Sequence, residues 1–289
     1  MTASTIPIAP AVPAAPGRRL PRAGLLIPAA LAVLLVLVAL AAPLLAPDDP
    51  AAGSLRDRLL DPGSPGHPLG TDGQGRDVLS RLIWGARPSL TGGLVPVAVA
   101  AVLGSALGIA AGLGGRVTEQ GLLRTLDVLY AFPGLLLAIA VATVLEAGVG
   151  ATVFSLSVVL TPVVTRVAYT EVQRIRSAEY LEAARVSGAG RTAIAVRQVL
   201  PVIAPVVLAY ASSLIGLAIV YAAGLSFLGL GVAPPAAEWG AMLDESRPAL
   251  LTHPWVAVLP ALTILAVSVL FTVLGEALRR RVGTGEDAR

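Results

Sequence analysis

Residues 90–113 read LTGGLVPVAVAAVLGSALGIAAGL, a run in which no side chain carries a charge. As an α-helix this run would be about 36 Å long, whereas the hydrocarbon core of a bilayer is about 30 Å thick. Inside lipid only a helix or a closed barrel satisfies all of its own backbone polar groups. The run is therefore predicted to be a transmembrane helix.

Five other apolar runs accompany this one along the chain. They occupy residues 24–46, 131–148, 150–170, 201–224 and 255–277. Gly and Pro interrupt several of them, as is common in membrane helices. We therefore predict an all-α membrane protein with six transmembrane helices. The run 24–46 is too long for the apolar core of a signal peptide, so we expect an uncleaved anchor.

The composition agrees with a lipid environment and excludes several chemistries. Of the 289 residues, 55% are hydrophobic and only 13% are charged. There is no Lys for a Walker A loop, there is no Cys for a thiolate metal site, and there are only two His. We therefore expect no catalytic, cofactor or metal site of its own, and any ATP hydrolysis to occur on another chain. The net charge of +3 is spread over the loops between apolar runs, which indicates membrane topology and not nucleic-acid binding.

The distribution of arginine predicts the orientation. Six crossings place both termini on one side of the membrane, and the segments on that side hold fourteen of the 21 arginines, against six opposite. The first set comprises residues 1–23, 114–130, 173–198 and the C-terminal end, and the second comprises 47–89 and 225–254. Because basic loops stay in the cytoplasm, both termini are predicted to be cytoplasmic in a multi-pass protein of the plasma membrane.

The predicted organisation follows from these assignments. The Pro- and Ala-rich start of the chain has little capacity for burial and is expected to be disordered. The order is a cytoplasmic tail over 1–23, a first transmembrane helix over 24–46, an extracytoplasmic loop over 47–89, a five-helix core over 90–280 that contains the loop 173–198, and a cytoplasmic tail over 281–289.

The loop 173–198 contains the most informative motif. Residues 179–191 read EYLEAARVSGAGR, and Leu200-Pro201 follows at the start of the next run. Acidic side chains in the first turn and two alanines favour a short helix, and Gly188 is expected to end it. Such a compact helix can lie on the membrane surface and insert into a groove on a soluble partner.

This segment resembles the Glu-Ala-Ala loop of binding-protein-dependent ABC permeases, which has Glu-Ala-Ala, three residues, Gly, and a Leu-Pro near the next span. The resemblance implies a coupling helix that docks onto an ATPase subunit, with Glu182 anchoring the contact. The coupling residues predicted in this way are Glu179, Glu182, Ala183, Ala184, Arg185 and Gly188. The alternative is a basic loop that happens to contain common residues.

Two further segments narrow the resemblance. Residues 69–90 are similar to the GTD, GRD, SR, GAR and SL signature of the dipeptide/oligopeptide/nickel permeases, in the shorter of their two paired subunits. Residues 225–232 and 238–243 are also similar to that subunit. The resemblance covers about residues 20–285 and implies the MetI-like fold of type I ABC importer permeases. The chain departs from it at 222–224, Ala-Ala-Gly, where the family often has a polar or acidic residue.

Charged residues gather where the extracytoplasmic loop meets the run 90–113. Asp72, Arg76, Asp77, Arg81 and Arg87 can form ion pairs with one another. One interpretation is a docking surface for an external binding protein, formed by the first four. The other is a set of ion pairs that stabilises the loop itself.

Several single residues have alternative interpretations. Gly104, Gly108 and Gly112 share one helical face, which predicts close helix packing, inside this chain or with a second permease. Arg166 lies in an apolar run near its cytoplasmic end, and we expect it to snorkel, with a gate contact as the alternative.

The aromatic and histidine residues outside the runs suit simpler roles. Trp84 and Trp239 are expected in the interfacial aromatic belt. His67 and His253 are expected at the surface, and a role in handling nickel stays open.

The sequence thus predicts the permease subunit of an ATP-dependent importer of di- or oligopeptides. The resemblance implies a second permease subunit, two ATPase subunits that bind ATP and Mg²⁺, and an extracytoplasmic binding protein as partners. The alternative is a secondary transporter driven by an ion gradient, which usually needs acidic or His residues within its spans. An intramembrane hydrolase ranks last because no apolar run contains His.

Overall fold

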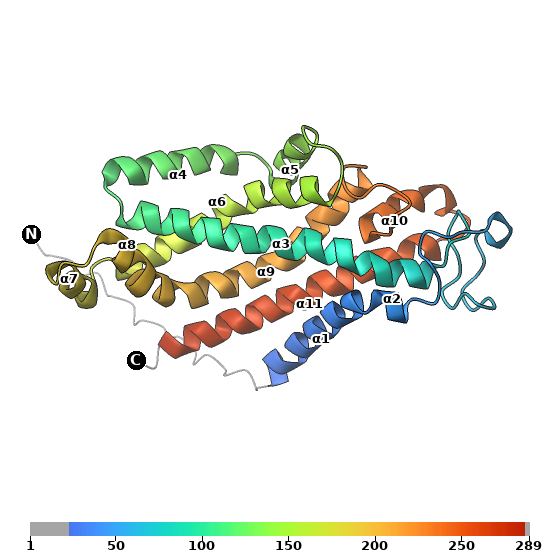
Figure 1. Ribbon diagram of the computed structural model, residues 1–289, viewed down its shortest axis with the longest axis horizontal. Coiled ribbons are helices and arrows are strands. Elements are labelled where there is room, and N and C mark those ends of the chain that lie inside the picture. Colours follow the sequence, from blue (N-terminus) through green and yellow to red (C-terminus); the bar gives the residue numbers. More distant parts are fainter. Residues whose placement is uncertain (1–22, 287–289) are drawn as a thin grey trace, which may run out of the picture.

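Long apolar helices laid side by side dominate the computed structural model, which describes residues 23–286 (Figure 1). Four helices in this part of the chain are long and apolar enough to cross a membrane, and each satisfies its own backbone hydrogen bonds. They are α3 (Val78–Leu113), α6 (Val149–Ile175), α9 (Leu200–Phe227) with the turns that precede it, and α11 (Trp255–Glu286).

The bundle has two distinct ends (Figure 1). One carries the short helix α7 (Glu179–Val186) and is called the α7 end below. The opposite end, called the loop end, carries residues 47–77 and α10 (Trp239–Glu245). α3 and α6 both run from the loop end toward the α7 end. Most of the predicted tail 1–23 lies outside the described residues.

The first apolar run forms a shorter helix than predicted. α1 (Ala23–Leu40) is followed by the single turn α2 (Ala42–Leu45), and α1 lies beside α11 at the edge of the bundle (Figure 1). Its 18 residues give a length of about 27 Å, close to the thickness of a hydrocarbon core. α1 therefore reaches across a bilayer only with the help of its flanking residues.

The predicted helix over 131–148 is wrong. That run contains only α5 (Gly134–Ala142), whose nine residues are about 14 Å long. The preceding loop, 114–130, is instead a helix, α4 (Arg116–Tyr130), which is bent by 89° against α5. The sequence reading missed α4 because its charged residues hide an amphipathic helix from a search for uninterrupted apolar runs. The two helices together can make a fifth crossing.

Other predicted boundaries shift because the helices extend beyond the apolar runs. α3 begins at Val78 and not near residue 90, since the Asp77 side chain caps it by accepting the Ser80 N–H at 2.7 Å. The helix predicted to start at 201 begins with α8 (Arg191–Ile194) and a π-helical turn (Ala195–Val199). The loops 47–89 and 173–198 are correspondingly shorter than predicted.

The glycine stripe packs α3 against α6 inside this chain. A Cβ atom on Gly104 would lie 2.8 Å from Val164 Cβ, and one on Gly112 would lie 2.4 Å from Val172 Cγ1. Glycine lets the two helix backbones approach this closely. Of the two alternatives for the stripe, the structure shows packing within the bundle.

The stripe predicts opposite effects for two matched substitutions. In Gly108→Ala the new Cβ would lie 2.6 Å from Ala168 Cβ and 2.8 Å from the Tyr169 backbone nitrogen, so α3 and α6 must separate. Overpacking of this kind costs about 1–3 kcal/mol. Gly121→Ala in α4 meets nothing within 4 Å and should stabilise the helix by up to about 1 kcal/mol. Thermal unfolding of the detergent-purified protein should show a lower Tm for the first variant only, and equal Tm values would contradict the packing.

Candidate functional site

The short helix predicted over the Glu-Ala-Ala motif is present as α7, with one buried and one exposed face. Leu181 is fully buried and belongs to the same core cluster as Val172 of α6 and Val199 before α9. Ala184 packs against that cluster, so it helps to hold α7 on the bundle and does not face a partner. The exposed face carries Glu179, Tyr180, Glu182, Ala183, Arg185 and Val186.

Gly188 ends α7 with a hydrogen-bonded turn. Its φ of +81° lies in the left-handed region that favours glycine. The Gly188 N–H donates to the Arg185 carbonyl at 3.0 Å, and the Ala189 N–H donates to the Ala184 carbonyl at 3.0 Å. This pair of bonds is a Schellman motif. The predicted turn at Gly188 is confirmed, and it returns the chain directly into α8.

Two residues on the exposed face of α7 were not singled out from the sequence. Val186 is 89% exposed and Tyr180 is 41% exposed, although both are large and apolar. Large apolar side chains exposed together can mark a surface that binds another protein. Their position relative to the buried Leu181 could have been derived from helical periodicity once the helix was assigned.

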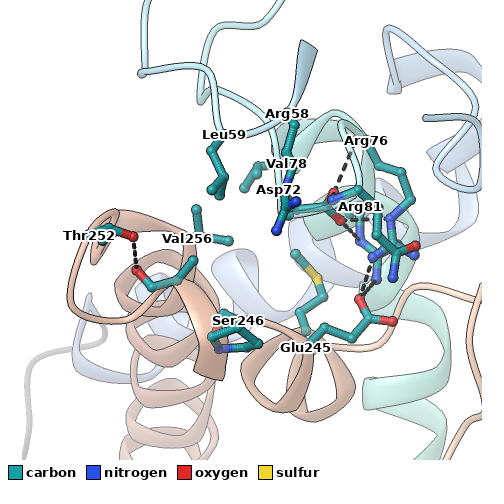
Figure 2. Close-up of a pocket in the computed structure, with 15 residues that line it drawn as sticks. Arg58, Leu59, Asp72, Arg76, Val78, Arg81, Glu245, Ser246, Thr252 and Val256 are labelled. Carbon is teal, nitrogen blue, oxygen red and sulfur yellow. Dashed lines mark hydrogen bonds and ion pairs between the residues drawn. The ribbon is translucent and has the colours of Figure 1, made fainter. Parts of the chain in front are cut away.

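At the loop end, three of the predicted charged residues, Asp72, Arg76 and Arg81, form a buried network with Glu245 (Figure 2). Arg76 donates from Nε to Asp72 Oδ2 at 2.7 Å and from Nη2 to Glu245 Oε2 at 2.5 Å. Arg81 Nη2 donates to the same Glu245 oxygen at 2.7 Å. The network borders a cavity of about 300 Å³ between the loop and α10. Glu245, which joins α10 to both arginines, was missed because it lies 164 residues beyond Arg81.

The burial of this network bears on the docking interpretation. Arg76, Arg81, Asp72 and Asp77 are at most 6% exposed. Side chains so deeply buried offer no surface to a partner, so the geometry favours the interpretation as ion pairs that stabilise the loop. Any role of these four residues in docking stays a prediction and would act through the shape of the loop.

Arg87 does not belong to the network, contrary to expectation. Its Nε and Nη2 donate to the Ala39 and Leu40 carbonyls at 2.7 and 2.8 Å, where α1 ends. Its guanidinium also lies 4.9 Å from the centre of the Trp84 ring. Arg87 therefore satisfies the C-terminal carbonyls of α1.

Trp239 is not the interfacial residue that the sequence suggested, and His67 is only partly exposed at the surface of the loop. His67 Nδ1 lies 3.0 Å from Asp77 Oδ1, and Asp48 places a carboxylate oxygen within 4.8 Å of both. Trp239 is 1% exposed, and its Nε1–H donates to the Leu82 carbonyl at 2.9 Å. Both side chains thus fasten segments at the loop end to α3.

The comparisons with known proteins agree with this architecture. Residues 104–284 match the family model described as "Binding-protein-dependent transport system inner membrane component". The chain belongs to this family. The permease is therefore a multi-pass membrane component of an ABC import system, and such a subunit is not itself the ATPase.

Individual relatives cover most of the permease. It is 38% identical over 247 residues to the glutathione transport system permease protein GsiD of Pectobacterium atrosepticum, covering 86% of this chain and 82% of that protein. It is 35% identical over 244 residues to the dipeptide transport system permease protein DppC of Alkalihalophilus pseudofirmus, with 84% and 80% covered. These findings confirm the predicted resemblance to the dipeptide/oligopeptide permeases.

A solved structure confirms the MetI-like fold. A chain of the MetNI methionine ABC transporter, in inward-facing conformations, matches with a TM-score of 0.55 at 16% identity. The match covers 70% of the permease and 96% of that chain.

The buried network predicts a large difference between neighbouring acidic residues of α10. Glu245→Ala leaves Arg76 and Arg81 buried without their shared acceptor, which typically costs about 3–5 kcal/mol. Asp244→Ala removes only an exposed pair with Arg247, which is worth at most about 1 kcal/mol. Thermal unfolding in detergent should separate the two variants clearly. Similar Tm values would show that Glu245 does not hold the loop to α10.

Proposed function

We propose that the permease is the membrane subunit of an ATP-driven importer of di- or oligopeptides, and that α7 is its coupling helix. The names of its relatives, glutathione and dipeptide transport permeases, support the substrate class. The observation that carries the coupling role is the geometry of α7: its outer face is exposed, while Leu181 and Ala184 fix its inner face to the core.

This geometry suits the transmission of force. α6 leads into α7 within a few residues, and the Gly188 turn returns the chain to α8 and α9. A movement of α7 is therefore imposed on two membrane-spanning helices at once. Two partner ATPase subunits, which bind ATP and Mg²⁺, would supply that movement by closing and opening.

The remaining partners complete the proposal. A second, homologous permease would pair with this one around a shared passage, and an extracytoplasmic binding protein would deliver the substrate at the loop end. The α7 end then lies in the cytoplasm, together with both termini. The excess of arginine on that side supports this orientation.

The coupling role predicts that the same substitution impairs transport at one exposed valine and not at another that is equally exposed. Val186 of α7 and Val117 of α4 are 89% and 87% exposed. Val186→Glu places a charge in the contact with the ATPase and should abolish both ATPase co-purification and ATP-dependent peptide uptake. Val117→Glu should leave both intact. Retention of both properties by Val186→Glu, or by Glu182→Arg, would refute the coupling role.

The orientation is testable because the sequence has no Cys. A membrane-impermeant maleimide should label Val186→Cys only in inside-out vesicles and Leu251→Cys only in intact, right-side-out ones. Leu251 is 96% exposed at the loop end and is the matched position. Labelling of Val186→Cys from the outside would exclude contact between α7 and a cytoplasmic ATPase.

A further inference from the structure

An ion pair joins α4 to α6 at the surface of the bundle. Arg166 of α6 donates to the carboxylate of Asp127 of α4, and its guanidinium lies 5.6 Å from the centre of the Tyr130 ring. Both charged side chains are about half exposed, at 52% and 50%. Unlike the buried network at the loop end, this pair is open to whatever surrounds the subunit.

The pair lies at the depth of the hydrocarbon core. Arg166 lies on α6 between Val164, which packs on Gly104, and Ala168, which packs on Gly108. The part of α3 that follows Arg87, residues 88–113, carries no charge and is about 39 Å long. A hydrocarbon core of about 30 Å centred on that stretch includes both glycines.

The pair does not snorkel to the nearer surface, so the predicted snorkelling of Arg166 is wrong. α4 runs antiparallel to α6, and Glu119 of α4 accepts a hydrogen bond from the Tyr169 hydroxyl. Along α4, Asp127 lies eight residues, or about 12 Å, closer to the loop end than Glu119. Along α6, Arg166 lies only three residues, or about 4.5 Å, closer to the loop end than Tyr169. The arginine side chain spans the difference by pointing toward the loop end, as helical side chains tilt toward their own N-terminus.

A half-exposed ion pair at this depth is incompatible with a surface of lipid tails. Charged side chains inside membranes face protein or a water-filled cavity. Exposed polar residues of α4 and α6 include Gln120, Arg124, Asp127, Arg166 and Thr170. By contrast, the large exposed side chains of α1 are apolar, among them Leu31, Leu34 and Leu37. α1 therefore suits lipid, whereas the α4–α6 face sets these charged side chains beside exposed apolar ones such as Val128 and suits lipid less well.

We propose that the Arg166–Asp127 pair lines the water-filled passage of the assembled importer and binds the charged ends of a zwitterionic substrate. Arg166 would take its carboxylate and Asp127 its ammonium group, and the Tyr130 ring would add a face for either the cation or an apolar side chain. This assignment rests on the proposed function, because it takes a peptide as the substrate. While no substrate is bound, the opposite charges of Arg166 and Asp127 compensate each other.

Water access tests the first half of the proposal. In the otherwise Cys-free importer, Tyr130→Cys retains the ion pair and replaces a residue that is 56% exposed. A charged methanethiosulfonate reagent reacts with thiolates in water, so it should modify Tyr130→Cys at least tenfold faster than Leu34→Cys, which is 55% exposed on α1. Equal rates would overturn the proposal and indicate that lipid or the second permease covers this face.

Substrate protection tests the second half. Dialanine and glutathione serve as probes, each used only if the unmodified importer accumulates it on ATP addition. A saturating amount of the accumulated probe should slow modification of Tyr130→Cys at least fivefold, and unchanged rates would exclude binding at the pair. Accumulation of neither probe would contradict the proposed substrate class, whereas the rate of modification without substrate would still report on the passage.

Charge changes separate binding from folding. Because the binding protein captures the substrate, Arg166→Gln should lower the maximal rate of dialanine uptake at least tenfold with little change in KM, and Arg166→Lys should restore most of the loss. The maximal rate of uptake of dialanine amide, which lacks the carboxylate, should not differ between the unmodified importer and Arg166→Gln. If Arg166→Gln impaired uptake of dialanine and of its amide equally, Arg166 would have only a structural role.

Discussion

The close contact between α3 and α6 is the constraint on which the rest of the bundle depends. Three glycines, at 104, 108 and 112, let the α3 backbone lie against Val164, Ala168 and Val172 of α6. In lipid no hydrophobic force drives helices together, so close van der Waals packing of this kind has to supply much of the association. Because α6 leads directly into α7, the contact between α3 and α6 also fixes the position of α7.

The connection between α7 and the core explains how a small surface helix can act on a large bundle. Leu181 is buried with Val172 and Val199, which belong to two different membrane helices. The contacts therefore allow little independent movement of α7. A force applied to its exposed face has to displace α6 and α9 together, which is the rigid-body behaviour that alternating access requires.

The charged residues divide into two groups with different physical roles. Around Glu245 they are buried, paired and shared between the loop and α10, so they stabilise one arrangement of the loop end. Between α4 and α6 they are half exposed at membrane depth, where only water or another protein satisfies them. The first group closes the fold on itself, whereas the second leaves both of its charges open to the surroundings of the subunit.

The sequence by itself determined the fold class, the family and the coupling motif. Charge-free runs longer than a bilayer leave few alternatives to a helix, and the short helix over Glu-Ala-Ala with its Gly188 stop depends on contacts within about ten residues. Only the tertiary structure decided how α4 and α5 together take the place of the span predicted over 131–148, which arginines pair with Glu245, and which way Arg166 points. Those outcomes depend on contacts between residues far apart in the chain, such as Asp127 with Arg166, and on helix direction, neither of which a hydropathy pattern encodes.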